Sequence, residues 1–143
     1  MADFVPIDIA SARKFLEANH CAVLAARKKD GTIQMTPVTA GLDAEGRAII
    51  SSRESAYKVR NLRRDPATSL CVFTSAFHGG GWVQINGCAE VTSLPVALET
   101  LMYLQRQVYG EHHDWSAFHK RMERERRVII RIAIESVGPG RRG

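Results

Sequence analysis

Four cations lie close together in the segment SAYKVRNLRRDP, residues 55–66, which also contains the aromatic Tyr57. Lys58 stands near the expected start of a helix and follows the strand AIISS, which ends in Ser51 and Ser52. A helix start presents free N–H groups and the positive end of its dipole, and a lysine ammonium with serine hydroxyls completes a set of donors for phosphate. The segment can therefore hold a phosphorylated ligand. A solvated helix face is the common alternative for such a charge run.

Two other segments contain residue types that bind ligands or metals. EHHDW, residues 111–115, has carboxylates and imidazoles, but adjacent histidines do not face each other on a helix or strand, so a polar loop is the better interpretation. HGGGW, residues 78–82, lacks the spacing of a phosphate-binding glycine loop, and a strand follows it. Its Trp82 either packs in the core or covers a flat ring or a neighbouring subunit. We predict no metal site and assign no catalytic side chain, because no hydrolase motif is present.

The expected strands follow one another with turns between them. They lie in the two halves of CAVLAARKKDGTIQMTPVTAGLD, joined at Asp30-Gly31, and in RAIISS, ATSLCVFT, GWVQINGCAEVTS and RRVIIRIAIESV. Such a succession of six strands favours an antiparallel sheet or barrel over a doubly wound parallel sheet. The length of 143 residues suits one domain with a real core.

Helical spacing predicts the elements between these strands. A first helix follows Asp8, its expected N-cap. The cationic segment forms a helix with Ser55 as N-cap, ends at Asp65 before a proline, and turns Val59 and Leu62 inward. Two more helical segments are expected in VALETLMYLQRQVYG and DWSAFHKRMERE.

Composition and charge limit the class of protein. The contents of 45% hydrophobic and 24% charged residues are those of an ordinary soluble protein, and the apolar runs are too short to span a bilayer. We therefore expect a cytoplasmic protein without membrane insertion, whose Cys21, Cys71 and Cys88 are buried reduced thiols. Positive charge is local, because residues 53–66 contain five cations and two acids, and residues 120–142 contain eight cations and three acids. Local basicity fits an anionic ligand at least as well as nucleic acid.

Taken together, these segments resemble the flavin-binding split β-barrel family related to pyridoxamine 5′-phosphate oxidase, and most closely its branch that uses the deazaflavin coenzyme F420. The resemblance covers nearly the whole chain and is most specific in KVRNLRRDP, from Lys58 to Pro66. It implies a mainly β protein: an antiparallel six-stranded split barrel with peripheral helices, a single domain over residues 1–143, assembled as a homodimer.

The resemblance also implies where the cofactor binds. Family members place two cofactors at the subunit interface, so Lys58 would bind phosphate, helped by the end of the Ser51–Ser52 strand. The strand MTPV would lie against the cofactor ring, and Trp82 would approach from the other subunit. The residues so expected to bind cofactor are Met35, Thr36, Pro37, Val38, Ser51, Ser52, Tyr57, Lys58, Arg60 and Trp82. Family members often have a second arginine where this chain has Ala56, so Arg53 or Arg60 would replace it.

These features predict an oxidoreductase that passes a hydride from reduced F420 to an unsaturated or quinone-like small organic substrate. A cofactor that performs the chemistry makes a catalytic triad unnecessary. The two basic segments, brought to one groove, would hold the anionic tail of the deazaflavin. The same fold with flavin mononucleotide (FMN) is the main alternative. Two further alternatives are a ligand carrier without turnover and a nucleic-acid-binding module. The scarcity of aromatic residues among the cations argues against nucleic-acid binding.

Overall fold

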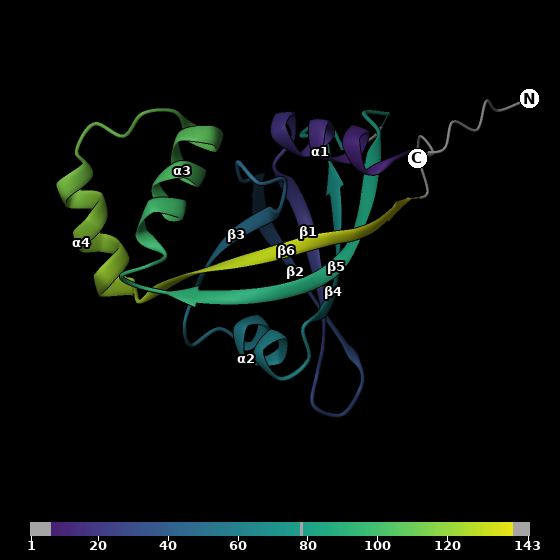
Figure 1. Ribbon diagram of the computed structural model, residues 1–143, viewed down its shortest axis with the longest axis horizontal. Helices are drawn as coiled ribbons and strands as arrows, with labels where there is room; N and C mark the ends of the chain where they lie inside the picture. The colour runs from purple at the N-terminus through teal and green to yellow at the C-terminus, as the bar shows by residue number, and fades with distance from the viewer. Residues whose placement is uncertain (1–6, 78, 139–143) are drawn as a thin grey trace, which may run out of the picture.

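The six strands of the chain form a closed antiparallel barrel in the order β1-β2-β3-β6-β5-β4, in a computed structural model that describes residues 7–77 and 79–138 (Figure 1). The strands are β1 (Cys21–Arg27), β2 (Ile33–Leu42), β3 (Ala48–Arg53), β4 (Ala67–Phe73), β5 (Trp82–Ser93) and β6 (Arg127–Gly138). The helices are α1 (Ile9–Ala18), α2 (Tyr57–Arg64), α3 (Leu98–Tyr109) and α4 (Trp115–Glu125). The mainly β class and the antiparallel six-stranded barrel are therefore confirmed.

The barrel interior is filled by alternate residues of each strand, since successive side chains of a strand point to opposite faces. On β6, Val128, Ile130 and Ile132 are buried in this core. The expected turn at Asp30-Gly31 joins β1 to β2: Gly31 has φ +90°, a conformation that glycine adopts without strain. The Asp30 carboxylate accepts a hydrogen bond of 3.0 Å from the Thr32 N–H and fixes this turn.

Two helices close the ends of the barrel (Figure 1). At one end, α1 buries Leu16, and its N-cap is Asp8 as expected, accepting a 2.7 Å hydrogen bond from the Ser11 N–H. At the other end, α2 buries Val59 and Leu62, which confirms their predicted inward direction. The prediction of Ser55 as N-cap of α2 is wrong. The helix begins at Tyr57, so its N-cap is Ala56, whose side chain cannot accept a capping hydrogen bond.

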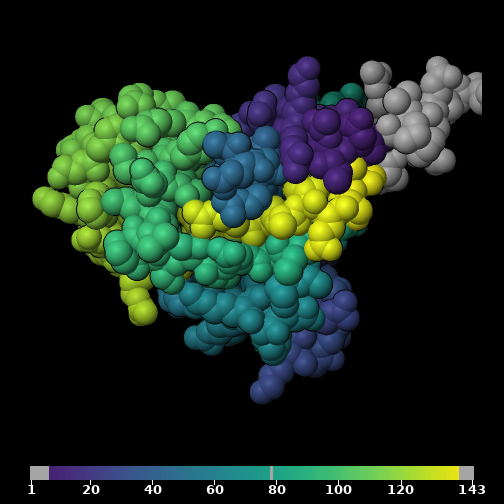
Figure 2. Space-filling model, in the orientation of Figure 1, coloured from purple at the N-terminus to yellow at the C-terminus, as the bar shows by residue number. Residues whose placement is uncertain are grey.

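The remaining helices, α3 and α4, pack on the outside of β3 and β6 and make a second core. Their apolar side chains meet the outward residues of the two strands in a cluster that includes Ile49, Leu101, Leu104, Phe118 and Ile129. Figure 2 shows the α3–α4 pair, in green, as a continuous block beside the barrel, with α1 next to the turn between β2 and β3. The barrel and its helical cover therefore enclose a space between them.

A side-chain clip fixes α3 to β2. The Gln107 amide donates a 2.9 Å hydrogen bond to the Leu42 carbonyl and accepts a 2.8 Å bond from the Leu42 N–H. Gly41 makes this approach possible, because a Cβ atom there would lie 2.5 Å from the Gln107 side-chain oxygen and 2.6 Å from a Leu104 methyl group. The position of α3 relative to the barrel is therefore set by hydrogen bonds as well as by packing.

Replacing Gln107 by alanine should lower the free energy of unfolding by about 1–3 kcal/mol, because it leaves a part-buried N–H and a part-buried C=O without partners. Urea denaturation followed by circular dichroism measures this change. The matched control is Gln105→Ala on the same helix, where no side-chain hydrogen bond is lost among the described residues. Equal stabilities of the two variants would contradict the role of the clip.

The expectation of buried cysteines is wrong. Cys21 and Cys88 are exposed and Cys71 is only partly buried. The reason is strand alternation: the neighbours Ala22, Leu70 and Val72 take the inward positions, so the thiols point outward. Apolar strand segments alone do not tell which of the two alternating sets faces the core.

Candidate functional site

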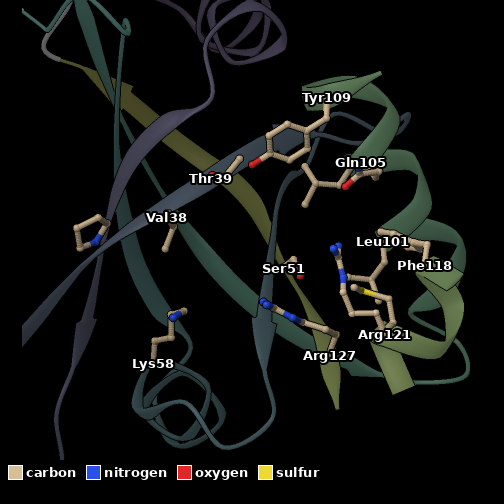
Figure 3. A pocket seen from close by; sticks show the side chains of 13 residues that line it. Val38, Thr39, Ser51, Lys58, Leu101, Gln105, Tyr109, Phe118, Arg121 and Arg127 are labelled. Carbon is tan, nitrogen blue, oxygen red and sulfur yellow. The ribbon is translucent and has the colours of Figure 1, made fainter. Parts of the chain in front are cut away.

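A cleft of about 320 Å³ lies between the barrel and its helical cover (Figure 3). Residues of β2, β3, β6 and the three helices α2, α3 and α4 contribute to it. Its lining consists of Pro37, Val38, Thr39, Ser51, Lys58, Leu101, Leu104, Gln105, Tyr109, Phe118, Arg121, Met122 and Arg127.

The cleft exists because β2 and β3 separate. In the described part of the chain, the pairing of β2 with β3 is limited to Ala40–Leu42 of β2. The pairing of β2 with β1, on its other side, extends from Thr39 to Ile33. The β2 edge over Ile33–Thr39 is therefore not covered by its neighbouring strand. Backbone groups on such an edge need other partners, which a planar ligand with polar edges can supply. This uncovered edge includes the segment that was expected to lie against a cofactor ring.

The floor of the cleft shows which of the two expected serines faces a ligand. Ser51 lines the cleft, but Ser52 is 2% exposed and points into the barrel, because consecutive strand residues alternate. The Ser52 hydroxyl is buried without a hydrogen-bond partner. The structure therefore brings Ser51 to the cleft and keeps Ser52 away from it.

Three cations line the cleft, and one acid balances part of their charge. Lys58 comes from α2, Arg121 from α4 and Arg127 from the start of β6. Glu125 accepts hydrogen bonds of 3.0 and 2.7 Å from the Arg127 guanidinium, and its other oxygen lies 3.8 Å from Arg121 Nε. The hydrogen bonds from Arg127 hold the pKa of the Glu125 carboxyl below its usual range, so it stays ionised. The cleft keeps a net positive charge.

Lys58 is the cation that stands out. In the residues that the structure describes, its ammonium has no hydrogen-bond or ion-pair partner, although the side chain is half-buried. Burial lowers the pKa of Lys58 from its ordinary value, and the nearby Arg127 guanidinium lowers it further. A half-buried ammonium that faces another cation is electrostatically unfavourable until an anion binds between them. This arrangement is typical of an anion-binding site.

The structure gathers only part of the expected set of cofactor-binding residues. Pro37, Val38, Ser51 and Lys58 line the cleft. The others do not line it in this chain: Met35, Thr36, Ser52, Tyr57, Arg60 and Trp82. Their part in cofactor binding stays a prediction.

The positions of these other residues have simple structural reasons. Met35 and Tyr57 are 69% and 71% exposed. Arg60 is exposed on α2 and lies over the Tyr57 ring, 5.9 Å from its centroid. Trp82 begins β5 opposite Phe73, at the other end of the barrel from α2.

Sequence reasoning missed the wall that α3 and α4 provide. Gln105 and Tyr109 contribute polar groups, and Leu101, Leu104 and Phe118 contribute apolar surface. The sequence predicts both helices, but the spacing of their apolar residues does not indicate that they cover β3. The basic segment 120–142 was the available signal for the two arginines of the cleft, and the structure places Arg121 and Arg127 in it beside Lys58.

The described residues of the segments EHHDW and HGGGW do not line this cleft. The first four residues of EHHDW lie in the loop between α3 and α4, where the rings of His112 and His113 stack with centroids 4.7 Å apart, and Trp115 begins α4. No group of three or more His, Cys, Asp or Glu residues suited to a metal ion is found in ranges 7–77 and 79–138. His78 lies outside the described residues, and Trp82 begins a strand as expected.

No helix within residues 7–77 and 79–138 has the length and apolar character needed to cross a membrane.

Solved structures share this fold over most of their length. A conserved hypothetical protein of Mycobacterium tuberculosis superposes with a TM-score of 0.77 at 23% identity, over 96% of this chain and 86% of that one. A protein named F420 reductase gives 0.68 at 21% identity, over 88% and 94%. An FAD-binding protein of Mesorhizobium loti gives 0.56 at 26% identity, over 92% and 90%.

The sequence itself identifies the family. The sequence pattern of pyridoxamine 5′-phosphate oxidase matches residues 10–139. This range includes every strand of the barrel and every helix, apart from the first residue of α1. The six-stranded barrel agrees with that match. The chain belongs to the pyridoxamine 5′-phosphate oxidase family of flavin-binding oxidoreductases.

Proposed function

We propose that the chain binds coenzyme F420 and transfers a hydride from the reduced cofactor to an unsaturated or quinone-like small organic substrate. The observation that carries this proposal is the cleft in which Lys58, Arg121 and Arg127 converge beside the uncovered edge of β2. A long ligand with a flat ring and an anionic tail satisfies both features together.

Each part of the cleft has a role in this proposal. The Lys58 ammonium holds the first phosphate, with the Ser51 hydroxyl as a second donor. Pro37 and Val38 lie against the ring, and the uncovered backbone edge meets its polar rim. When bound, the reduced deazaflavin supplies a hydride to one carbon of a conjugated acceptor, and a proton drawn ultimately from solvent completes the reduction. The protein orients the two molecules and excludes water between them.

The charge of the cleft favours F420 over FMN. The phosphate of FMN needs one or two cations, whereas the tail of F420 carries a phosphate and several carboxylates. Arg121 and Arg127 supply positive charge beyond Lys58, and Glu125 neutralises only part of it. The fold shared with a protein named F420 reductase supports this choice. FMN remains the alternative, and the likeness to an FAD-binding protein supports a flavin in general.

Turnover tests the proposed activity. The purified chain, mixed with reduced F420 and a quinone such as menadione, should restore the absorbance of oxidised F420 faster than the mixture without protein. The same assay with reduced FMN in place of F420 is the matched control. Equal or faster oxidation of FMN, with no acceleration for F420, would assign the cleft to a flavin.

Affinity for F420 should fall at alkaline pH because of Lys58. Its pKa in the folded chain is below 10.5, so the ammonium that holds the phosphate is lost as the pH rises through that lowered value. In the window between the lowered pKa and 10.5 the unfolded chain binds more protons, so stability without ligand rises with pH while affinity falls. Dissociation constants measured between pH 7 and 10 should show the loss, and Lys58→Arg should abolish it. An unchanged slope in that variant would contradict the assignment.

A second copy of the chain is the partner that we propose for the outer face of β1, β2, β4 and β5. Where these strands pair with one another, their outward residues are aligned and none of them is buried; Arg27 is the charged residue of this stretch, and Glu90 follows on the outward side of β5. The aligned residues are Cys21, Val23, Ala25, Arg27, Ile33, Met35, Pro37, Thr39, Ala67, Ser69, Cys71, Phe73, Trp82, Gln84, Asn86 and Cys88. A sheet face this large and almost uncharged marks an interaction surface. Pairing with a second copy would cover the exposed Met35 and give Trp82 a partner subunit.

Placing a charge on this face should separate the dimer. Met35→Lys buries an unpaired ammonium in the proposed interface, so we expect a monomer where the wild-type chain is a dimer. Sedimentation equilibrium measures the mass directly. Val96→Lys is the control, since Val96 is equally exposed but lies outside this face. A wild-type chain that stays monomeric at tens of micromolar contradicts the proposal.

A further inference from the structure

The cleft has a second polar end, formed by α3. Gln105 and Tyr109 are four residues apart, so they lie one above the other on the same side of the helix, and both line the cleft. Figure 3 shows them at the end opposite Lys58, with the Tyr109 hydroxyl directed toward Thr39 across the cleft. This end differs chemically from the cationic one.

Folding does not explain these two side chains. Tyr109 is 69% exposed and adds little to the core. Within the two described ranges, neither the Tyr109 hydroxyl nor the Gln105 amide has a hydrogen-bond partner. Two other residues of α3 show the contrast: Gln107 clips the helix to β2, and Tyr103 lies on another side, away from the cleft. Leu101 and Leu104 anchor the same helix in the outer core, so the helix that carries the two free polar groups is held in place.

We propose that Tyr109 and Gln105 bind the oxygen of a carbonyl acceptor and that Tyr109 supplies the proton of the reduction. This inference rests on the proposed function, since it places the acceptor next to the cofactor ring. The Tyr109 hydroxyl faces Thr39, which directly follows the β2 segment assigned to the ring. Uncharged donors suit an uncharged carbonyl oxygen, which points to enones and quinones rather than to anionic acceptors.

The chemistry balances with these groups. Addition of a hydride to the β-carbon of an enone moves the C=C electron pair toward the carbonyl and leaves an enolate oxygen. Two hydrogen-bond donors directed at that oxygen stabilise the charge as it develops. The Tyr109 O–H then gives its proton to the enolate, and the phenolate regains a proton from water. The exposure of Tyr109 allows that last transfer. The acceptor gains one hydride and one proton, and the enzyme returns to its starting state.

The test compares the variants Tyr109→Phe and Gln105→Leu with the control Tyr103→Phe. Tyr103 is on the same helix and is also exposed, but it does not line the cleft. Menadione is titrated into each chain without cofactor by calorimetry. Loss of one hydrogen bond should weaken its binding by about fivefold in the first two variants and leave the control unchanged. Thermal unfolding of each variant checks that the fold is intact.

Turnover of 2-cyclohexenone with reduced F420 gives the second measurement. Tyr109→Phe should lower kcat by about a hundredfold and remove the solvent deuterium isotope effect, with the F420 dissociation constant unchanged. If F420 fails to bind while menadione binding still depends on Tyr109 and Gln105, the proposed function is wrong and the acceptor site stands. If menadione affinity and kcat are the same in all variants, the inference is overturned.

Discussion

Replacing Lys58 by alanine is expected to weaken F420 binding by about ten- to a hundredfold. The ammonium is half-buried, has no partner among the described residues and faces the cleft beside Arg127. A hydrogen bond to a charged group in such surroundings contributes about 1.5–3 kcal/mol, which corresponds to that loss of affinity. Fluorescence titration of the purified variant with oxidised F420 measures it.

Arg60→Ala is the matched control for this experiment. It removes a cation from the same helix, but Arg60 is exposed, lies over Tyr57 and does not line the cleft. We expect its F420 affinity to stay within about twofold of the wild type at moderate salt, where exposed charges are screened, a result that would exclude Arg60 from the residues first predicted to bind cofactor. Equal losses in the two variants would mean that the general positive charge of α2, and not a site at Lys58, attracts the ligand.

Replacing Gly87 by alanine is expected to lower the free energy of unfolding by about 3 kcal/mol or more. A Cβ atom at this position would lie 1.9 Å from the Ala133 carbonyl oxygen and 2.9 Å from an Ile132 methyl group. Gly87 stands at an irregularity in the pairing of β5 with β6, the longest ladder in the described barrel. The clashing atom belongs to the backbone of the neighbouring strand, so the clash can be relieved only by displacing that strand.

Gly138→Ala provides the comparison, because a Cβ atom there would meet nothing within 4 Å. Gly138 lies opposite Gln84 at the end of β6, the strand with which the added methyl group of Gly87→Ala would clash. Its midpoint in urea should match that of the wild type. A Gly87→Ala chain as stable as Gly138→Ala would show that the two strands are not held as closely as the barrel geometry requires.

The strands could be predicted because the apolar residues and turn residues that identify them lie within each short segment of the sequence. The apolar set Val128, Ile130 and Ile132 marks β6 as a strand with a buried side, and the Asp30-Gly31 pair marks a turn within a few residues. The N-cap of α2 could not be fixed in this way. A serine one position too early offers the same local signal as a true cap, and only the exact start of the helix at Tyr57 decides between them.

The cleft could be predicted only in part, because it joins residues far apart in the sequence. Lys58 carried a local signal, a cation near a helix start that follows a strand. Ser51 and Ser52 could not be distinguished without knowing which face of β3 is covered by helices. Tyr109 and Gln105 reach the site because α3 packs on β3 and β6 and is clipped to β2 through Gln107, long-range contacts that no local pattern reveals.

Parallel titration of the purified chain with oxidised F420 and with FMN tests the central claim most directly. Ligand fluorescence is followed at moderate salt and neutral pH. We predict binding of F420 at least about tenfold tighter than binding of FMN, because the anionic tail of F420 adds charge-assisted contacts to those of the first phosphate. Tighter binding of FMN, or binding of neither ligand, would contradict the assignment of this cleft to a deazaflavin.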